Sequence, residues 1–457
     1  MLTRLKVQGF KNLLDVEVRF GPFTCITGKN AVGKSNLFDA IHFLHLLTRN
    51  SIMEAAQKLR EAKGRSPEPA SLFTSFGDFR APEIRFEADL IIDRNAEDKF
   101  GVEAEASISS VRYALALRLA EGERPERLEL LHESLEPRTL DSSRKELGFP
   151  ASKKFKTTAI QGRRTASFIS TLQEPEGPRI KVHQEGHGGR SREVPALQSS
   201  RTVLGGLDES DFPTILAIHR EMESWKTLML EPSAMRAPSD YRDPHWIDAR
   251  GAHLPATVER LERKGTPGEV QAELANRLAE LIEDVRGLRV RDDPATETLT
   301  VEVQGRDGVY HPARSLSDGT LRFLVLATLG LDPETRGLIS LEEPENGLHP
   351  KRIPAMLDLL RDIAVDPSLA VGTDNPLRQV LVNTHSPVVV RNVDRDDLVH
   401  FEEQLELRGR SRGRVARVTA PKGTWRTGES SAAPVTAPGD LEPYDPQLLL
   451  EGVALTG

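Results

Sequence analysis

The feature that most constrains this chain is a glycine loop near its N-terminus. The loop reads Gly28-Lys29-Asn30-Ala31-Val32-Gly33-Lys34-Ser35 and matches the pattern G-x-x-x-x-G-K-S. An apolar run at Phe23–Ile26 precedes it, and apolar residues recur at helical spacing from Leu37 to Leu47 after it. This order places backbone N–H groups and the positive end of a helix around a phosphate. The sequence therefore predicts a phosphate-binding strand–loop–helix unit, with Lys34 at the β- and γ-phosphates and Ser35 on Mg²⁺.

Composition excludes several classes of protein. The chain has 457 residues, 38% hydrophobic and 28% charged, and about 100–200 residues per domain suggests two to four domains. No stretch approaches the roughly 20 apolar residues that span a bilayer, and Met1–Gly9 lacks the apolar core of a secretory signal. We expect a cytoplasmic protein without membrane contact. The single cysteine, Cys25, excludes an intrachain disulfide or a cysteine metal cage and is expected in a buried strand.

Changes in composition divide the chain into four predicted regions. Residues 1–136 hold the glycine loop and an antiparallel meander, 137–312 a basic and helical insertion, 313–419 alternating helices and strands, and 420–457 a loose tail. The alternation predicts an α/β fold with a mostly parallel sheet, whose ligands bind at the carboxyl ends of the strands. The meander strands are expected at Ile84–Ile92, Phe100–Ile108, Val111–Leu119 and Arg127–Leu131.

A second motif is an apolar strand that ends in two carboxylates, Glu342 and Glu343. Alone, two such glutamates would usually be a solvated strand end. Beside a phosphate loop, the first is expected to join the Mg²⁺ shell and the second to orient or deprotonate the attacking water.

Two weaker motifs are expected at the same edge of the sheet. Arg314–Thr320 precedes a helix, where a serine and a glycine can donate to phosphate, although a serine there is more often a plain N-cap. Asn383–Pro387 follows an apolar strand and contains His385. A lone histidine in that place would usually be structural.

The four motifs in this order resemble the ABC-type ATPase heads of the SMC, RecF and OLD families, over the first 50 residues and from Arg314 to about Val390. The resemblance implies that Leu316–Thr320, written LSDGT, is the signature motif. It also implies that Glu342 is the Walker B acid, that Glu343 is the catalytic glutamate, and that His385 is the switch histidine that senses the γ-phosphate. The run from Glu343 to Pro350 resembles the E-P-E-x-x-L-H-P sequence of OLD-like ATPases.

Membership implies ATP and Mg²⁺ as cofactors, ATP hydrolysis, and a homodimer or higher homo-oligomer in which two heads enclose two ATP molecules. Lys34 would be catalytic together with Glu343 and His385, while Ser35 and Glu342 would hold the metal. Ser317 and Gly319 would act on the nucleotide of the other chain. A Q-loop glutamine is not evident, and Gln57 or the Phe76–Phe79 loop would replace it. The implied nucleotide-binding residues are Lys11, Asn12, Gly28, Lys29, Asn30, Ala31, Val32, Gly33, Lys34, Ser35, Asn36, Ser317 and Gly319.

Spacing selects a branch of the superfamily. Lys34 and Ser317 lie 283 residues apart, so the lobe between them is larger than the resemblance to transporter ATPases would imply, yet it lacks the long heptads of an SMC protein. Only 72 residues follow His385, too few for the Toprim nuclease of an OLD protein, and Asp394-Arg395-Asp396 is interpreted as a charged turn. The remaining match is a stand-alone OLD-like ATPase that controls a separately encoded effector, often a nuclease, in bacterial defence against phage.

Charge is unevenly distributed and keeps two alternatives open. Residues 144–201 carry 12 Lys/Arg and 5 Asp/Glu, a net +7 in a chain of net charge −8. This segment could contact a nucleic-acid backbone or form a solvated loop. A RecF-like repair ATPase acting on DNA, and a scaffold that uses ATP only for assembly, are the alternative functions.

Overall fold

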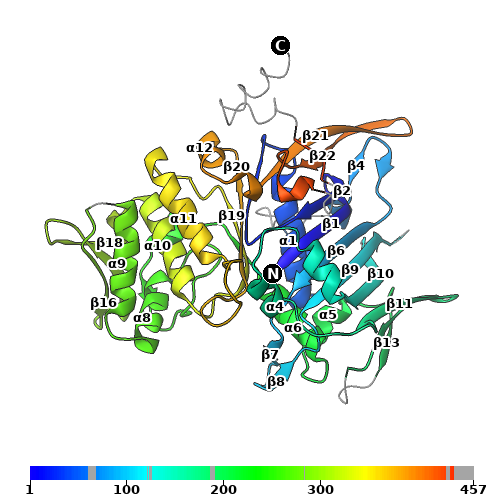
Figure 1. The fold of residues 1–457 in the computed structure, drawn as a ribbon, viewed down its shortest axis with the longest axis horizontal. Helices are drawn as coiled ribbons and strands as arrows, with labels where there is room; N and C mark the ends of the chain where they lie inside the picture. Colours follow the sequence, from blue (N-terminus) through cyan, green and yellow to red (C-terminus); the bar gives the residue numbers. More distant parts are fainter. Residues whose placement is uncertain are drawn as a thin grey trace, which may run out of the picture.

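The computed structural model describes residues 1–59, 68–120, 122, 126–185, 191–282, 284–428 and 433–436. Two large sheets form one side of the molecule, and a helical lobe lies beside them (Figure 1). The helices are α1 (Lys34–Arg49), α2 (Ile52–Lys58), α3 (Leu140–Glu146), α4 (Lys153–Ala159), α5 (Val203–Gly206), α6 (Pro213–Glu223), α7 (Pro232–Arg236), α8 (Leu254–Lys264), α9 (Glu269–Leu281), α10 (Asp318–Leu331), α11 (Ile353–Ile363) and α12 (Pro387–Arg391).

The first sheet is antiparallel and has eight strands in the order β13-β12-β11-β10-β9-β6-β1-β2. Along β1, Leu5 and Val7 are buried and Lys6 and Gln8 are half-buried, the alternation of a sheet with one face on a core. The strands are β1 (Leu2–Phe10), β2 (Leu13–Arg19), β6 (Ile84–Ile91), β9 (Ser110–Leu119), β10 (Leu128–Pro137), β11 (Ile169–Glu174), β12 (Gly177–Val182) and β13 (Arg192–Pro195).

The second sheet positions the predicted site. Its order is β14-β19-β20-β3-β21-β22, with every neighbouring pair parallel except β21 and β22. Every residue of β3 is buried, which suits a continuous apolar strand inside a parallel sheet. Because β19, β20 and β3 are parallel and adjacent in this order, the ends that carry Glu342, Thr384 and Gly28 lie at one edge. The strands are β3 (Phe23–Gly28), β14 (Lys226–Leu228), β19 (Gly337–Glu342), β20 (Arg378–Thr384), β21 (Leu398–Arg408) and β22 (Ser411–Thr419).

Helix α1 packs into the core between the two sheets. Phe43 of α1 meets Phe10 of β1 and Phe86 of β6, with ring centroids 6.2 and 5.8 Å apart. These rings belong to one apolar cluster that also includes Ile26 of β3. The helix that follows the glycine loop is thus held by both sheets.

The helical lobe has its own core, built around α10. This helix is apolar on most sides because it is covered by α7, α8, α9 and α11. A small sheet closes the lobe, formed by β15 (Ser239–Asp240), β16 (Gly287–Asp293), β17 (Thr298–Gln304) and β18 (Tyr310–Pro312).

The strand predicted at Phe100–Ile108 is wrong. The chain forms a short hairpin there, β7 (Asn95–Glu97) with β8 (Glu103–Glu105). The Asp98 carboxylate accepts hydrogen bonds from the N–H groups of Phe100 and Val102, at 2.8 and 3.0 Å. Such an Asx turn competes with an extended strand.

The stretch 137–312 contributes to three sheets rather than to one. β11–β13 extend the antiparallel sheet, β14 is an edge of the parallel sheet, and β15–β18 belong to the helical lobe. The division into four regions stays a prediction. In the tail, Ala420 bridges to Val435, and residues 437–457 lie outside the described part of the chain. The prediction that Cys25 is a buried strand residue is confirmed, and no described helix is long and apolar enough to cross a membrane.

Candidate nucleotide-binding site

The glycine loop has a backbone that only small residues allow. Gly28 has φ +147°, and a Cβ there would lie 2.3 Å from the Phe401 carbonyl oxygen of β21. Gly33 has φ +114°, and a Cβ there would lie 2.6 Å from Asn12 Oδ1. Ala31, at the crest, has φ +65°. A loop of this composition before a helix N-terminus fits a phosphate group.

Lys34 connects the loop to the two glutamates. Its ammonium donates to the carbonyl oxygens of Gly28 and Lys29, at 2.6 and 2.7 Å. Burial lowers the pKa of Lys34, and the carboxylates of Glu343 and Glu342 oppose that shift. The structure therefore brings the first two motifs within electrostatic reach of one another.

The turn after β1 braces the loop. Asn12 Nδ2 donates to the Val32 carbonyl at 3.1 Å, and Asn12 Oδ1 accepts from Asn36 Nδ2 at 2.8 Å. Lys11 Nζ pairs with Asp39 of α1 at 2.6 Å. Of the predicted nucleotide contacts outside the loop, these three lie beside it.

Glu343 is held from two sides at the end of β19. Its Oε1 lies 2.6 Å from His385 Nδ1, and its Oε2 accepts from Asn346 Nδ2 at 2.8 Å. Its backbone takes φ +48°, and its N–H donates to the Asn383 carbonyl at 2.9 Å. The second and fourth motifs, from neighbouring strands, thus meet at one carboxylate.

The edge offers the donors that Mg²⁺ and a water nucleophile require. The Ser35 hydroxyl and the Glu342 carboxylate are hard oxygen ligands of the kind Mg²⁺ prefers alongside phosphate and water. Asn383 Nδ2 lies 3.3 Å from Glu342 Oε1. Glu343 carries a carboxylate in reach of a histidine, an arrangement that can orient a water and accept its proton.

The predicted signature motif, Leu316–Thr320, lies at the start of α10. Ser317 caps α10, its Oγ accepting from the Thr320 N–H at 3.2 Å. Gly319 is buried against the turn after Glu343, because a Cβ there would lie 2.6 Å from the Gly347 carbonyl oxygen. Helix α10 belongs to the helical lobe and α1 to the core between the sheets (Figure 1). Among the described residues, no hydrogen bond or ion pair joins Ser317 or Gly319 to Lys34, which bonds to Gly28 and Lys29 instead.

The sequence analysis assigned no role to two half-buried charged residues near Glu343, namely Glu345 and Arg322. Glu345 Oε1 accepts from Thr384 Oγ1 at 2.5 Å, and Oε2 has no hydrogen-bond partner within the described residues. Burial raises the pKa of Glu345, and the Glu343 carboxylate adds to that shift. Burial lowers the pKa of Arg322, against the nearby Asp318, Glu345 and Glu343. Glu345 could have been marked from its E-P-E motif, whereas Arg322 carries no local signal.

Arg236 is a second residue that the sequence did not indicate. Its guanidinium pairs with the Asp318 carboxylate and donates to the Leu316 carbonyl at 3.2 Å. It therefore holds the signature turn from α7, 82 residues earlier in the chain. Neither the periodicity nor the spacing of residues in the sequence indicates this contact.

Neither Q-loop candidate forms a hydrogen bond or ion pair with the glycine loop among the described residues. Gln57 is an exposed residue of α2. The Phe76–Phe79 loop forms a hairpin of β4 (Ser75–Phe76) and β5 (Phe79–Arg80) against β22, where the Asp78 N–H donates to Ser411 Oγ at 2.9 Å. The Q-loop equivalent stays a prediction.

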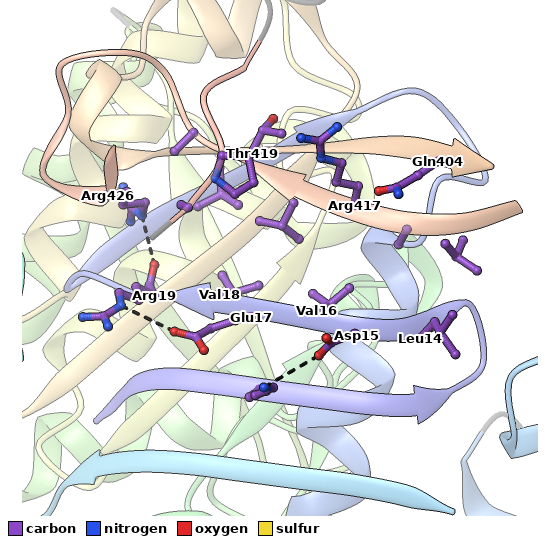
Figure 2. Close-up of a pocket in the computed structure, with 18 of the residues that line it drawn as sticks. Leu14, Asp15, Val16, Glu17, Val18, Arg19, Gln404, Arg417, Thr419 and Arg426 are labelled. Atoms are coloured by element: carbon purple, nitrogen blue, oxygen red, sulfur yellow. Dashed lines mark hydrogen bonds and ion pairs between the residues drawn. The ribbon is translucent and has the colours of Figure 1, made fainter. Parts of the chain in front are cut away.

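A cavity of about 490 Å³ lies between β2 and β22, the edge strands of the two large sheets. Figure 2 shows Leu14–Arg19 of β2 facing Arg417 and Thr419 of β22 across it, with Arg426 at one end. Its described lining includes none of the predicted nucleotide-binding residues. This cavity is therefore separate from the candidate site.

Comparisons with known proteins agree with the motifs. A family model described as "AAA domain, putative AbiEii toxin, Type IV TA system" matches residues 23–391. A stretch of 45 residues is 49% identical to the DNA replication and repair protein RecF of Parabacteroides distasonis, covering 10% of this chain and 12% of that protein's length.

Solved SMC heads align with the chain at low identity. An SMC head bound to the C-winged helix domain of ScpA matches at 14% identity and TM-score 0.46, over 91% of this chain and 97% of its own. The SMC head domain from Thermotoga maritima matches at 13% and 0.40, over 92% and 99%.

The family model spans most of the chain and includes the glycine loop, both glutamates and His385. The chain therefore belongs to the AAA domain family that this description names.

Proposed function

We propose that this chain hydrolyses ATP as a cytoplasmic, dimeric switch that controls a separately encoded effector, a nuclease in the simplest case, in bacterial defence against phage. The observation that carries the ATPase part is the position of Glu343. Its carboxylate is fixed by His385 and Asn346 at the same sheet edge as the glycine loop.

Each residue of the edge has a role in this proposal. The loop Gly28–Ser35 binds the phosphates of ATP, with Lys34 facing the β- and γ-phosphates. Ser35 and Glu342 hold Mg²⁺, which neutralises phosphate charge when bound. Glu343 positions a water and takes its proton, while His385 orients the carboxylate and contacts the γ-phosphate.

The proposal of a dimer is supported by the placement of the two halves of the proposed site on different helices, α1 and α10. Ser317 and Gly319 lie in the helical lobe, so a nucleotide on the loop of one chain would meet them only from a second copy. This composite site would make the dimer depend on ATP. The opening of this dimer after ATP hydrolysis would be the switching step.

The proposal of a separate effector is supported by the family description and not by the geometry of the site. The family description names a toxin–antitoxin system, which by its name has two components. That supports a partner encoded apart from this chain. Its identity as a nuclease, and the role in phage defence, come from the resemblance to stand-alone OLD-like ATPases.

The test measures the rate of ATP hydrolysis together with the molar mass of the protein in solution. Phosphate release from Mg–ATP and the molar mass by light scattering would be measured for the wild type and for Glu343→Gln, alone and with the product of the neighbouring gene. We expect turnover in the wild type, and a dimer trapped by ATP in the variant. A monomer that hydrolyses ATP equally well in both proteins would reject the proposal.

The second candidate is a RecF-like ATPase that acts directly on DNA. The 45-residue stretch at 49% identity to RecF favours it, although this stretch covers only 12% of that protein. Hydrolysis that requires DNA and ignores the neighbouring gene product would select this candidate.

A further inference from the structure

An arginine-rich turn lies at the end of the long hairpin of β21 and β22. The turn residues are Gly409 and Arg410, since Arg408 pairs directly with Ser411. Gly409 has φ +60°, which a two-residue hairpin turn needs at its first position. Figure 1 shows this hairpin extending past the body of the molecule beside β4. We call its end, residues 408–414, the arginine tip; its four arginines are Arg408, Arg410, Arg412 and Arg414.

Two of these arginines are not neutralised by any residue in the described part of the chain. Arg408 pairs with Glu406 at 3.0 Å, and Arg414 pairs with Glu403 at 3.1 Å. Arg410 and Arg412 are exposed, and neither forms an ion pair or side-chain hydrogen bond with any described residue. Two guanidinium groups with free donors therefore face solvent next to each other.

The tip has one free face and one braced face. Leu407 pairs with Arg412 across the hairpin, and Leu405 with Arg414, so these four share a face. Leu407 is 65% exposed and Leu405 is 48% exposed. Such exposure is unusual for apolar side chains of a strand.

The opposite face packs on the hairpin of β4 and β5. A Cβ on Gly413 would lie 2.2 Å from the ring of Phe76, and the Asp78 N–H donates to Ser411 Oγ at 2.9 Å. Phe76 and Phe79 are 4.9 Å apart by ring centroid, with Arg408 over Phe79 at 6.0 Å. The tip is therefore held in place rather than free to fold back.

The same strand reaches the glycine loop. The Ala416 N–H donates to the Asn12 carbonyl at 2.9 Å, and a Cβ on Gly33 would lie 3.0 Å from Ala416 Cβ. Ala416 is four residues beyond Arg412, which corresponds to about 13 Å along a strand. A ligand on the tip would thus act on a strand that touches the phosphate loop.

We propose that the arginine tip binds the phosphate backbone of a nucleic acid, with Arg410 and Arg412 as the principal contacts, and that β22 transmits this binding to the glycine loop. Guanidinium groups bind phosphate through paired N–H donors. A protruding hairpin can enter a groove, where exposed leucines meet sugars and bases. The binding stands on the tip alone, whereas its effect on hydrolysis rests on the proposed function.

The basic segment 144–201 is the weaker candidate for the same ligand. Part of its excess charge is neutralised in the fold: Arg179 and Lys181 lie near Glu193, and Arg192 pairs with Glu209 at 3.0 Å. Lys153 and Lys154 of α4 are exposed. They provide a matched control, because replacing them removes the same charge from another surface.

The test compares two double variants of the full chain by fluorescence anisotropy, with labelled 20-mer duplex DNA, single-stranded DNA and RNA at several salt concentrations. We expect Arg410→Gln with Arg412→Gln to flatten the log–log salt slope by about 1.8, and to weaken binding roughly 50-fold at 0.1 M salt, equally for all sequences. Lys153→Gln with Lys154→Gln should change both much less. Unfolding midpoints of both variants should match the wild type.

Three outcomes would overturn the proposal: unchanged affinity and slope in the arginine variant, an equal loss in the lysine control, or no salt-dependent affinity in the wild type. In the last case an acidic protein would be the ligand of the tip. In the wild type, nucleic acid should alter ATP turnover, and the arginine variant should lose that response. A wild type that binds nucleic acid but hydrolyses no ATP would reject the proposed function and leave the binding assignment intact.

Discussion

The Nδ1 atom of His385 lies 2.6 Å from Oε1 of Glu343, although the two residues end neighbouring strands and are 42 apart in the chain. The second carboxylate oxygen is held by Asn346. Because each oxygen of the Glu343 carboxylate has a partner, the loss of His385 would free one side of this carboxylate and change its orientation. The two residues are expected to behave as one unit in any kinetic experiment.

Glu343→Gln should lower the rate of ATP hydrolysis by about 10²–10⁴-fold, because the amide cannot accept the proton of the attacking water. ATP binding should remain. Phosphate release and binding of a fluorescent ATP analogue measure the two effects. Glu269→Gln, at an exposed position of α9, is the matched control and should leave both unchanged. Wild-type turnover in Glu343→Gln would remove this residue from the mechanism.

Lys34→Ala should act on binding itself. The variant loses the cation that would face the β- and γ-phosphates, and charge-assisted hydrogen bonds contribute about 1.5–3 kcal/mol, or roughly 10–100-fold in affinity. Calorimetric titration with ATP and Mg²⁺ measures it. Undiminished affinity would contradict the assignment of the loop.

Ser317→Arg should leave ATP binding by the monomer nearly intact while blocking dimerisation and hydrolysis. Mixing this variant with Lys34→Ala chains sharpens the test. A heterodimer then has one site with an intact loop and an intact Ser317, and one site in which both are altered. Partial recovery of turnover is expected. Heterodimers that form but hydrolyse nothing would argue against a composite site.

Gly319→Ala should destabilise the signature turn. A Cβ there would lie 2.6 Å from both the Gly347 carbonyl oxygen and Leu348 Cδ2, and such overpacking typically costs about 1–3 kcal/mol. Gly206→Ala is the control, because a Cβ at that position meets nothing within 4 Å. Urea unfolding compares the two. Equal free energies of unfolding for the two variants would show that the turn accommodates the added methyl group without loss of stability.

Glu133 is expected to make stability depend on pH. Burial raises its pKa to about 7, although its carboxylate accepts from the Val203 and Leu204 N–H groups at 2.6 and 2.8 Å. Since the folded pKa exceeds the unfolded one, this contribution is complete below about pH 4.5 and is lost as the pH rises through 7.

Urea unfolding between pH 5 and 8 checks this expectation. The wild type should lose up to about 1.4 kcal/mol per pH unit relative to Glu133→Gln over that range. The amide in the variant keeps an acceptor but does not titrate. Parallel stability profiles for the two proteins would place the titration elsewhere.

The sequence was sufficient where the contacts that shape a segment are local. Lys34 bonds to Gly28 and Lys29, a few residues away, and β3 and β19 are short, mostly apolar segments. The loop, both strands and the glutamate pair were therefore predictable.

Contacts between distant segments carried no such signal. β14 is only three residues long and joins the parallel sheet by pairing with β19, and Arg236 meets Asp318 across 82 residues. The strand expected at Phe100–Ile108 did not form because the Asp98 carboxylate accepts hydrogen bonds from the N–H groups of Phe100 and Val102, which makes a turn there. In each case tertiary contacts or side-chain turns outweighed the local apolar pattern.

The placement of β3 between β20 and β21 sets an order of events during synthesis. Arg378, the first residue of β20, is made 350 residues after Gly28, a delay of roughly 20–70 s at ribosomal rates. Until then the phosphate loop has neither neighbour that fixes its strand, and Gly28 lacks the Phe401 backbone it packs against. A nascent chain should consequently bind no ATP until β20 and β21 have been made, and the ability to hold nucleotide should mark the moment when these two strands pair with β3.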